Sequence, residues 1–285
     1  MSTLSGQEKS QSDMANFNQR VTTALIGLPI ALLAAYLGGW PMTILIGLIA
    51  AIGTLEFCVL AHGQDIQGSA IVAVPTTLAV VLAFHLGIPA IWVLALALAV
   101  SITFLLEMLR HPRQIRRSLL QTGMTLAGVL YIGFPSAFLI AIRGLPDGLT
   151  WLMVVLALTW GTDTFAYFGG RRFGKTPLAP VLSPKKTVEG AIIGMIGGAV
   201  SAFIFLAVGG KVSLLALVMI CIAPPVAVLG DLFESAIKRF FHIKDSHLAG
   251  LDIFPGHGGV LDRIDALVVV TTLCYLFLSL IGVAL

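Results

Sequence analysis

The chain has 285 residues and a mean hydropathy of +0.99, with 58% hydrophobic and only 11% charged residues. These values exclude an ordinary water-soluble globular protein and predict an all-α membrane protein that crosses the bilayer several times. The formal net charge of +3 is small, so nucleic acid is not an expected partner. The three cysteines lie in apolar runs, and their spacing fits neither a zinc motif nor a disulfide framework.

Apolar runs of about 20 residues predict nine transmembrane helices. Residues 1–19 form a polar N-terminal tail, residues 20–142 hold the first five spans, and residues 143–285 hold the last four. The expected spans are 20–38, 41–61, 68–86, 90–109, 118–142, 149–169, 188–208, 213–234 and 265–285. Glycine- and proline-containing turns separate them.

The positive charges indicate how the chain is oriented. If the N-terminus is cytoplasmic, all but two of the 17 Lys and Arg lie on the inner side, the exceptions being Arg143 and Lys211. The positive-inside rule therefore predicts a multi-pass protein of the cell (inner) membrane, with the N-terminus inside and the C-terminus outside. The basic loop 110–117 is expected to face anionic lipid, with a direct catalytic role as the alternative.

The eighth span contains Pro224 and Pro225, which predict a break in the helix because proline removes a backbone donor. The half-helix beyond them carries one polar stripe with spacing i, i+3, i+4 and i+7. Its members are Asp231, Glu234, Ser235 and Lys238. One interpretation is a functional site; the other is a set of ion pairs, Lys238 with Asp231 or Glu234, that reach the membrane interface.

The segment P-G-H-G-G at 255–259 predicts a phosphate site at the start of the last span. Glycines allow close backbone approach, and the first N–H groups of the following helix are expected to be unpaired. Asp262 and Asp265 lie one turn apart, although acidic residues in a first turn also complement the helix dipole. Together with Asp231 they predict oxygen ligands for Mg²⁺, with two cations as the usual arrangement for displacement at phosphorus.

A third polar patch follows span six. Asp163 lies within the inner part of the membrane, and an intramembrane carboxylate suggests a function. Lys185, Lys186 and Thr187 stand at the mouth of span seven, where they either hold a polyphosphate or only mark the inner boundary. The glycines of span seven predict close helix packing. They are Gly190, Gly194, Gly197 and Gly198.

The run 230–265, with S-x-x-K-R, K-D, P-G-H-G-G and D-R-I-D, resembles the signature of the phosphatidate cytidylyltransferase (CDP-diacylglycerol synthase) family. S-P-K-K-T at 183–187 with the following E-G, and D-T-F-A-Y-F-G-G-R-R-F-G-K from Asp163, are similar to other motifs of that family. The segment 246–254 is roughly four residues longer than is usual there, so Ser246, His247 and Asp252 are assigned no role.

The resemblance implies a helical membrane enzyme, commonly a homodimer, that transfers the cytidylyl group of CTP to phosphatidate and releases pyrophosphate. It also implies Mg²⁺ and, in some members, a monovalent cation such as K⁺. The catalytic residues that it implies are Asp231, Asp262, Asp265, Lys238 and His257, with the three aspartates as metal ligands. The expected substrate-binding residues are Ser183, Lys185, Lys186, Thr187, Ser235, Arg239, Lys244, Asp245, Gly258, Gly259, Arg263 and Asp163.

Three rival functions make different predictions. A transporter or channel would place its charges near the bilayer midplane and show repeat symmetry, which the chain lacks. A CDP-alcohol phosphotransferase would carry D-x-x-x-D groups around one helix, and these are not found. An inactive scaffold would be expected to lose the carboxylates or lysines. Spans one to five contain no motif that indicates a catalytic or binding function. Their Glu56 and Glu107 either line a cavity or are ordinary boundary charges.

Overall fold

A computed structural model describes residues 25–61, 66–88, 90–243 and 259–282. The fold is mostly helical, as predicted, and the helix Leu25–Leu37 comes first. The elements that follow are α2 (Gly39–Val59), α3 (Ala70–Leu86), α4 (Ala90–Arg110), α5 (Ile115–Gly128), η1 (Val129–Gly133), α6 (Phe134–Gly144), α7 (Gly148–Leu156), η2 (Ala157–Gly161), α8 (Thr162–Phe173), β1 (Pro177–Ala179), β2 (Ser183–Thr187), α9 (Val188–Val208), α10 (Leu214–Phe240) and α11 (Leu261–Leu280).

Within the described residues, seven helical stretches are long and apolar enough to cross a membrane. Two of them are composite: α5, η1 and α6 form Ile115–Gly144, and α7, η2 and α8 form Gly148–Phe173. Leu25–Leu37 and α3 are apolar but shorter. The predicted runs therefore correspond to helices, but the count of nine spans is not confirmed, and the orientation stays a prediction.

The predicted helix break at the proline pair is wrong. Pro224 and Pro225 lie inside α10, which continues for 27 residues as one helix. Membrane helices tolerate proline because neighbouring groups and local adjustments accommodate the freed carbonyls. The helical irregularities lie elsewhere, in the two five-residue π-helical segments η1 and η2.

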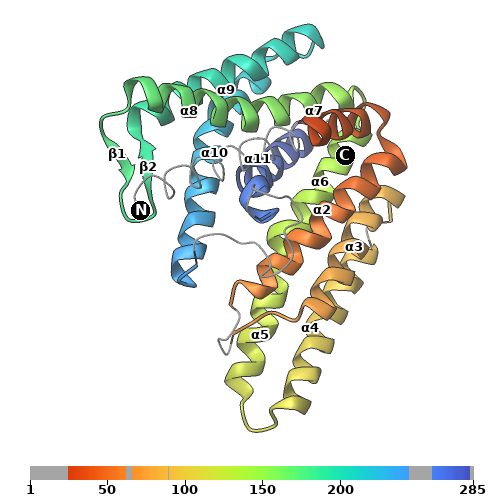
Figure 1. The fold of residues 1–285 in the computed structure, drawn as a ribbon. Coiled ribbons are helices and arrows are strands. Elements are labelled where there is room, and N and C mark those ends of the chain that lie inside the picture. The colour runs from red at the N-terminus through yellow and green to blue at the C-terminus, as the bar shows by residue number, and fades with distance from the viewer. Residues whose placement is uncertain (1–24, 62–65, 89, 244–258, 283–285) are drawn as a thin grey trace, which may run out of the picture.

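The all-α prediction also needs one correction, because the S-P-K-K-T motif forms a strand. β1 pairs antiparallel with β2, with Pro177 opposite Thr187 and Ala179 opposite Ser183. The hairpin projects from the end of the α8–α9 pair (Figure 1). The basic residues of this motif are therefore carried on a short ribbon.

The predicted close packing of the glycine-rich span is confirmed. α8 and α9 lie side by side (Figure 1). A Cβ atom at Gly194 would lie 2.6 Å from the carbonyl oxygen of Thr162 and from Cβ of Ala166, and one at Gly190 would lie 2.9 Å from Cα of Gly170. The two helices can approach this closely because α9 presents glycines to α8.

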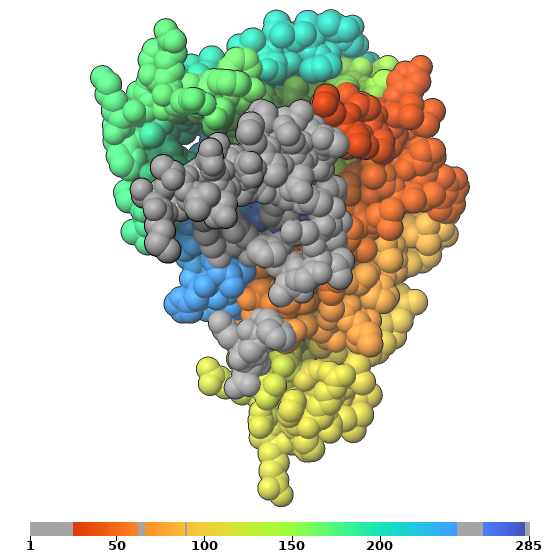
Figure 2. Space-filling model, in the orientation of Figure 1, coloured from red at the N-terminus to blue at the C-terminus, as the bar shows by residue number. Residues whose placement is uncertain are grey.

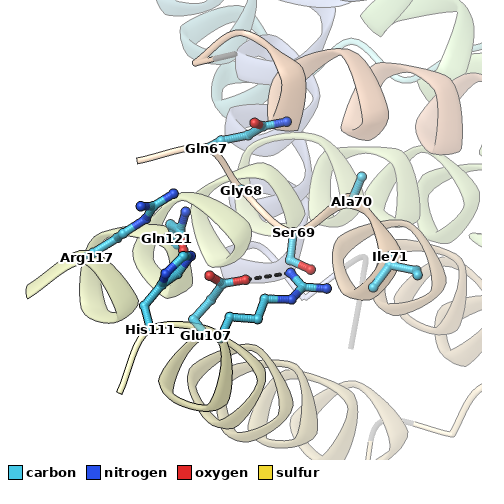
Figure 3. Close-up of a pocket in the computed structure, with 10 residues that line it drawn as sticks. Gln67, Gly68, Ser69, Ala70, Ile71, Glu107, His111, Arg117 and Gln121 are labelled. Carbon is cyan, nitrogen blue, oxygen red and sulfur yellow. Dashed lines mark hydrogen bonds and ion pairs between the residues drawn. The ribbon is translucent and has the colours of Figure 1, made fainter. Parts of the chain in front are cut away.

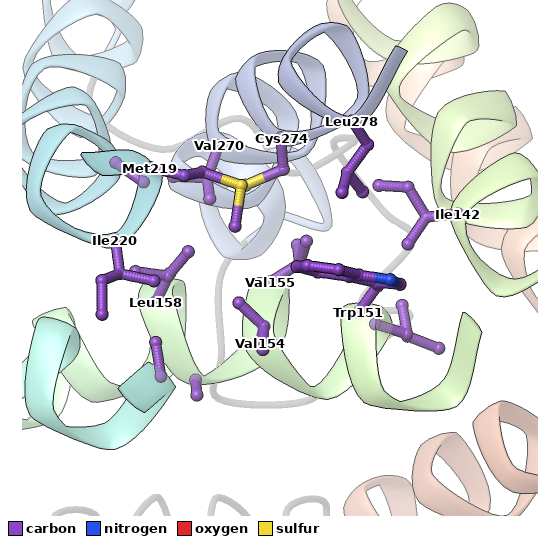
Figure 4. Close-up of a cluster of buried hydrophobic side chains, with 14 of the residues drawn as sticks. Ile142, Trp151, Val154, Val155, Leu158, Met219, Ile220, Val270, Cys274 and Leu278 are labelled. Atoms are coloured by element: carbon purple, nitrogen blue, oxygen red, sulfur yellow. The ribbon is translucent and has the colours of Figure 1, made fainter. Parts of the chain in front are cut away.

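The largest buried apolar cluster lies where α7, α10 and α11 meet. Trp151 and Leu158 face Met219, Val270 and Cys274 across this core (Figure 4). A second cluster joins α2, α3 and η1. Figure 2 shows the α4–α5 end, in yellow, at the opposite end of the molecule from the β1–β2 hairpin and α9. The first cluster holds together the two helices, α10 and α11, that carry the three predicted metal-binding aspartates.

Candidate active site

A lysine joins α10 to α11 at the predicted acidic site. Nζ of Lys238 lies 2.7 Å from Oε2 of Glu234 and 2.9 Å from Oδ1 of Asp262. The side chain of Glu234 is only 2% exposed. The predicted ion pair between Glu234 and Lys238 is therefore present, and the same lysine also contacts Asp262 of the neighbouring helix.

The hairpin brings a second lysine to the same region. Lys186 on β2 forms an ion pair with Asp231 of α10, so the S-P-K-K-T motif and the acidic stripe meet in space. Asp163 of α8 is close enough for the charges of Asp231 and Lys186 to act on it. All three polar patches predicted from the sequence therefore converge.

Asp265 completes the acidic cluster. Its carboxylate accepts a hydrogen bond from the N–H of Ala266 at 2.7 Å. The charges of Asp231, Glu234 and Asp163 act on it electrostatically. Below, "acidic cluster" means Asp163, Asp231, Glu234, Asp262 and Asp265. Five carboxylates from α8, α10 and α11 therefore gather beside Lys186 and Lys238, and carboxylate oxygens are the ligands that hard cations prefer.

The expectation of unpaired N–H groups at the start of the last helix is wrong. The N–H groups of Val260 and Leu261 donate to Oε1 and Oε2 of Glu56, at 2.9 and 2.8 Å. The N–H of Gly259 donates to Oδ2 of Asp262 at 3.1 Å. Glu56, 3% exposed on α2, thus caps the helix that carries Asp262 and Asp265. The sequence analysis named Glu56 only as a cavity-lining or boundary charge, and neither interpretation predicted this capping role; the available signal was a carboxylate within an apolar run.

Two polar side chains around the hairpin have structural partners. The hydroxyl of Thr187 accepts a hydrogen bond from the N–H of Gly190 at 3.2 Å and caps α9. The Glu189 carboxylate accepts from the N–H groups of Lys175 and Thr176, at 3.0 and 3.1 Å. These bonds fasten the start of the ribbon to α9 and so help to hold Lys186 near α10.

The remaining predicted residues are distributed around this centre. Ser183 and the exposed Lys185 lie on β2, Ser235 and Arg239 lie on α10, and the exposed Arg263 lies on α11. Nη1 of Arg239 donates to the carbonyl oxygen of Ile243 at 3.3 Å. His257, Gly258, Lys244 and Asp245 lie outside the described residues.

Comparison with known proteins identifies the family of this chain. The model of the cytidylyltransferase family matches residues 18–281. The chain belongs to the cytidylyltransferase family. A phosphatidate cytidylyltransferase of Bacillus subtilis is 31% identical over 277 residues, which are 94% of this chain and 99% of the relative. One of Staphylococcus haemolyticus is 32% identical over 263 residues, 91% of this chain and 98% of the relative.

A phosphatidate cytidylyltransferase of Brucella abortus is more similar over a shorter region. It is 44% identical over 161 residues, which are 54% of this chain. The match spans 57% of the length of that relative.

The carboxylates of the acidic cluster are the candidate metal ligands of this chain. No group of three or more His, Cys, Asp or Glu in the described part of the chain is arranged to hold a metal ion. Asp231 and Asp262 contact lysines instead. The donors are nonetheless carboxylate oxygens from neighbouring helices, which is the chemistry that a hard cation such as Mg²⁺ prefers. Such an ion keeps several waters and takes substrate phosphates as ligands, so few protein ligands suffice.

A separate polar cavity of about 360 Å³ lies between α3, α4 and α5 (Figure 3). Glu107, His111, Arg117 and Gln121 line it, and Glu107 pairs with Arg110 at 2.9 Å. None of the predicted site residues lies in this lining. Glu107 is thus a cavity-lining residue, as one of the two sequence interpretations had it, and the cavity is distinct from the acidic cluster.

Proposed function

We propose that this protein transfers the cytidylyl group of CTP to phosphatidate and so forms CDP-diacylglycerol and pyrophosphate. The observation that carries the proposal is the convergence of Asp231, Asp265, Lys186 and Lys238 from α10, α11 and β2. Membership of the cytidylyltransferase family and two relatives named phosphatidate cytidylyltransferase that match over nearly their whole length support it.

The reaction needs charge compensation more than it needs a base. Phosphatidate is a phosphomonoester with a second pKa of about 6, so its attacking oxygen is already anionic at neutral pH. That oxygen forms a bond to the α-phosphorus of CTP while the bond to the β-phosphate oxygen breaks. Negative charge then accumulates on the pyrophosphate leaving group, where cationic groups stabilise it.

The lysines and carboxylates have complementary roles in this proposal. Lys186 and the exposed Lys185 of β2 bind the triphosphate or the lipid phosphate, and Lys238 holds Asp262 against α10. Asp231 and Asp265, with Asp262, would hold Mg²⁺, which neutralises phosphate charge when bound. A second divalent cation and a monovalent cation such as K⁺ belong to the same proposal.

The cellular setting is also part of the proposal. Several apolar helices and the relatives indicate a membrane protein. We place it as a multi-pass protein in the cell (inner) membrane, with the acidic cluster on the cytoplasmic face, because the positive residues collect on the segments that carry this cluster. A homodimer is the proposed assembly.

The experiment that tests the function is pyrophosphate release by detergent-purified protein given CTP, phosphatidate and Mg²⁺. Asp265→Asn should lower the rate by at least about 100-fold, the range seen when a group that stabilises transition-state charge is lost. Asp147→Asn is the matched control, because Asp147, between α6 and α7, pairs with Lys211, between α9 and α10, away from the acidic cluster. Folded wild-type protein that releases no pyrophosphate over a range of Mg²⁺ and K⁺ concentrations contradicts the proposal, and ion flux in vesicles then becomes the next assay.

A further inference from the structure

Tyr131 lies beside α10, the helix that carries Asp231 and Glu234, and belongs to the half of the chain in which the sequence shows no catalytic motif. It lies at the centre of η1, the π-helical segment Val129–Gly133 between α5 and α6. Such segments insert an extra residue into a helical turn, change the direction of the following side chains, and occur frequently at functional sites. η1 is therefore a candidate for positioning a side chain that acts on substrate.

The ring of Tyr131 is fixed between two helices. Its centroid lies 5.9 Å from that of Phe57 on α2 and 5.8 Å from that of Phe233 on α10. Phe233 directly precedes Glu234 of the acidic cluster. These contacts hold the ring in one place beside α10.

Ile132, the residue after Tyr131, shows that η1 also packs beside α11. A Cβ atom at Gly53 of α2 would lie 3.4 Å from Cδ1 of Ile264 and 3.5 Å from Cγ2 of Ile132. Ile132 follows Tyr131, and Ile264 precedes Asp265. η1 thus lies at the junction of α2, α10 and α11.

The hydroxyl of Tyr131 is buried, and no described residue forms a hydrogen bond with it. The charges of Asp265, Glu234 and Asp231 act on it. A buried hydroxyl without a partner is unfavourable, and phenylalanine would pack the same ring without this cost. The hydroxyl is therefore suited to a partner that arrives with the substrate.

We propose that the Tyr131 hydroxyl donates a hydrogen bond to a phosphate oxygen of the bound substrate. A phenol can donate to an anion while remaining neutral, so it adds a donor to the site without changing the charge balance between the carboxylates and lysines. Both substrates of the proposed function carry phosphate, either the triphosphate of CTP or the phosphomonoester of phosphatidate. The inference rests on that function and assigns one of its phosphate contacts to the N-terminal half.

The test is Tyr131→Phe, with CTP and phosphatidate varied separately. The variant should lose about tenfold in kcat/KM, which is about the effect of one hydrogen bond made to substrate. A raised KM for CTP identifies the triphosphate as the partner, and a raised KM for phosphatidate identifies the lipid phosphate. A fall in kcat alone indicates a bond made only in the transition state. The temperature of unfolding should be equal to or above the wild-type value, because the ring remains and the buried hydroxyl without a partner is removed.

Tyr275→Phe is the control for removal of a hydroxyl. Tyr275 lies on α11, with its ring stacked on Phe138 at a centroid distance of 4.3 Å. Tyr275→Phe should change neither kcat nor the KM for CTP or for phosphatidate. Kinetic constants of Tyr131→Phe within twofold of wild type would overturn the inference alone and leave the proposed function standing. An inactive wild type would reject the function and this role together.

Discussion

The two halves of the molecule contribute to the candidate site in different ways. The region α8–α11 carries the carboxylates and lysines in dense motifs, so its chemistry is visible in the sequence. The region α2–α6 adds two isolated groups, Glu56 and Tyr131, whose importance depends on where the helices place them. A candidate site in a membrane protein can therefore depend on apolar helices whose sequences show no catalytic motif.

The largest expected effect tests the ion-pair network of the C-terminal region. Lys238→Met removes the ammonium group that lies 2.7 Å from Oε2 of Glu234 and leaves that buried carboxylate without this cation. Breaking a buried pair in this way costs about 3–5 kcal/mol. We expect a loss of this order in the free energy of unfolding, measured by SDS titration, together with loss of pyrophosphate release.

A double variant separates the two losses. Adding Glu234→Gln to Lys238→Met removes the uncompensated charge of Glu234 but not that of Asp262, so part of the lost stability should return. Activity should stay low, because Asp262 still lacks its lysine. Recovery of activity along with stability would show that Lys238 serves folding alone.

The next largest effect is expected from a substitution in the N-terminal region, at Glu56. Glu56→Ala leaves the N–H groups of Val260 and Leu261 without acceptors, and loss of such a cap costs about 1–2 kcal/mol. Because α11 carries Asp262 and Asp265, we also expect roughly a tenfold lower kcat, on the scale of 1.36 kcal/mol per factor of ten. Glu56→Gln keeps one acceptor oxygen and should be intermediate in both stability and kcat.

Glu107→Gln provides the matched control for Glu56. Glu107 is also a buried glutamate on an N-terminal helix, 5% exposed, but it pairs with Arg110 in the separate cavity (Figure 3). It should lower stability and leave kcat unchanged. If Glu56→Gln and Glu107→Gln lower kcat equally, the hydrogen bonds from the start of α11 to Glu56 have no specific role in activity. The N-terminal region would then not contribute to the site through Glu56.

Hydropathy and spacing predicted much of this molecule. The apolar runs located the helices, and the Asp231 stripe, S-P-K-K-T and D-R-I-D identified segments that the fold brings together. The pairing of Lys186 with Asp231 was not predictable, because it depends on how a hairpin folds back toward α10. The Pro224–Pro225 interpretation failed because local proline chemistry was given more weight than the surrounding helix packing.

The smallest expected effect on activity tests the contact between α8 and α9. Gly194→Ala would place Cβ 2.6 Å from the Thr162 carbonyl oxygen, and overpacking of this kind costs about 1–3 kcal/mol. Separation of α9 from α8 should also move Asp163 relative to Lys186, so we expect a fewfold lower kcat/KM. Gly123→Ala is the control, because a Cβ there meets no atom within 4 Å, and replacing a helical glycine should stabilise the protein by about 0.5–1 kcal/mol. If Gly194→Ala and Gly123→Ala change the free energy of unfolding equally, α8 can shift away from α9 without an energetic cost. Close contact between α8 and α9 would then have no part in holding the acidic cluster.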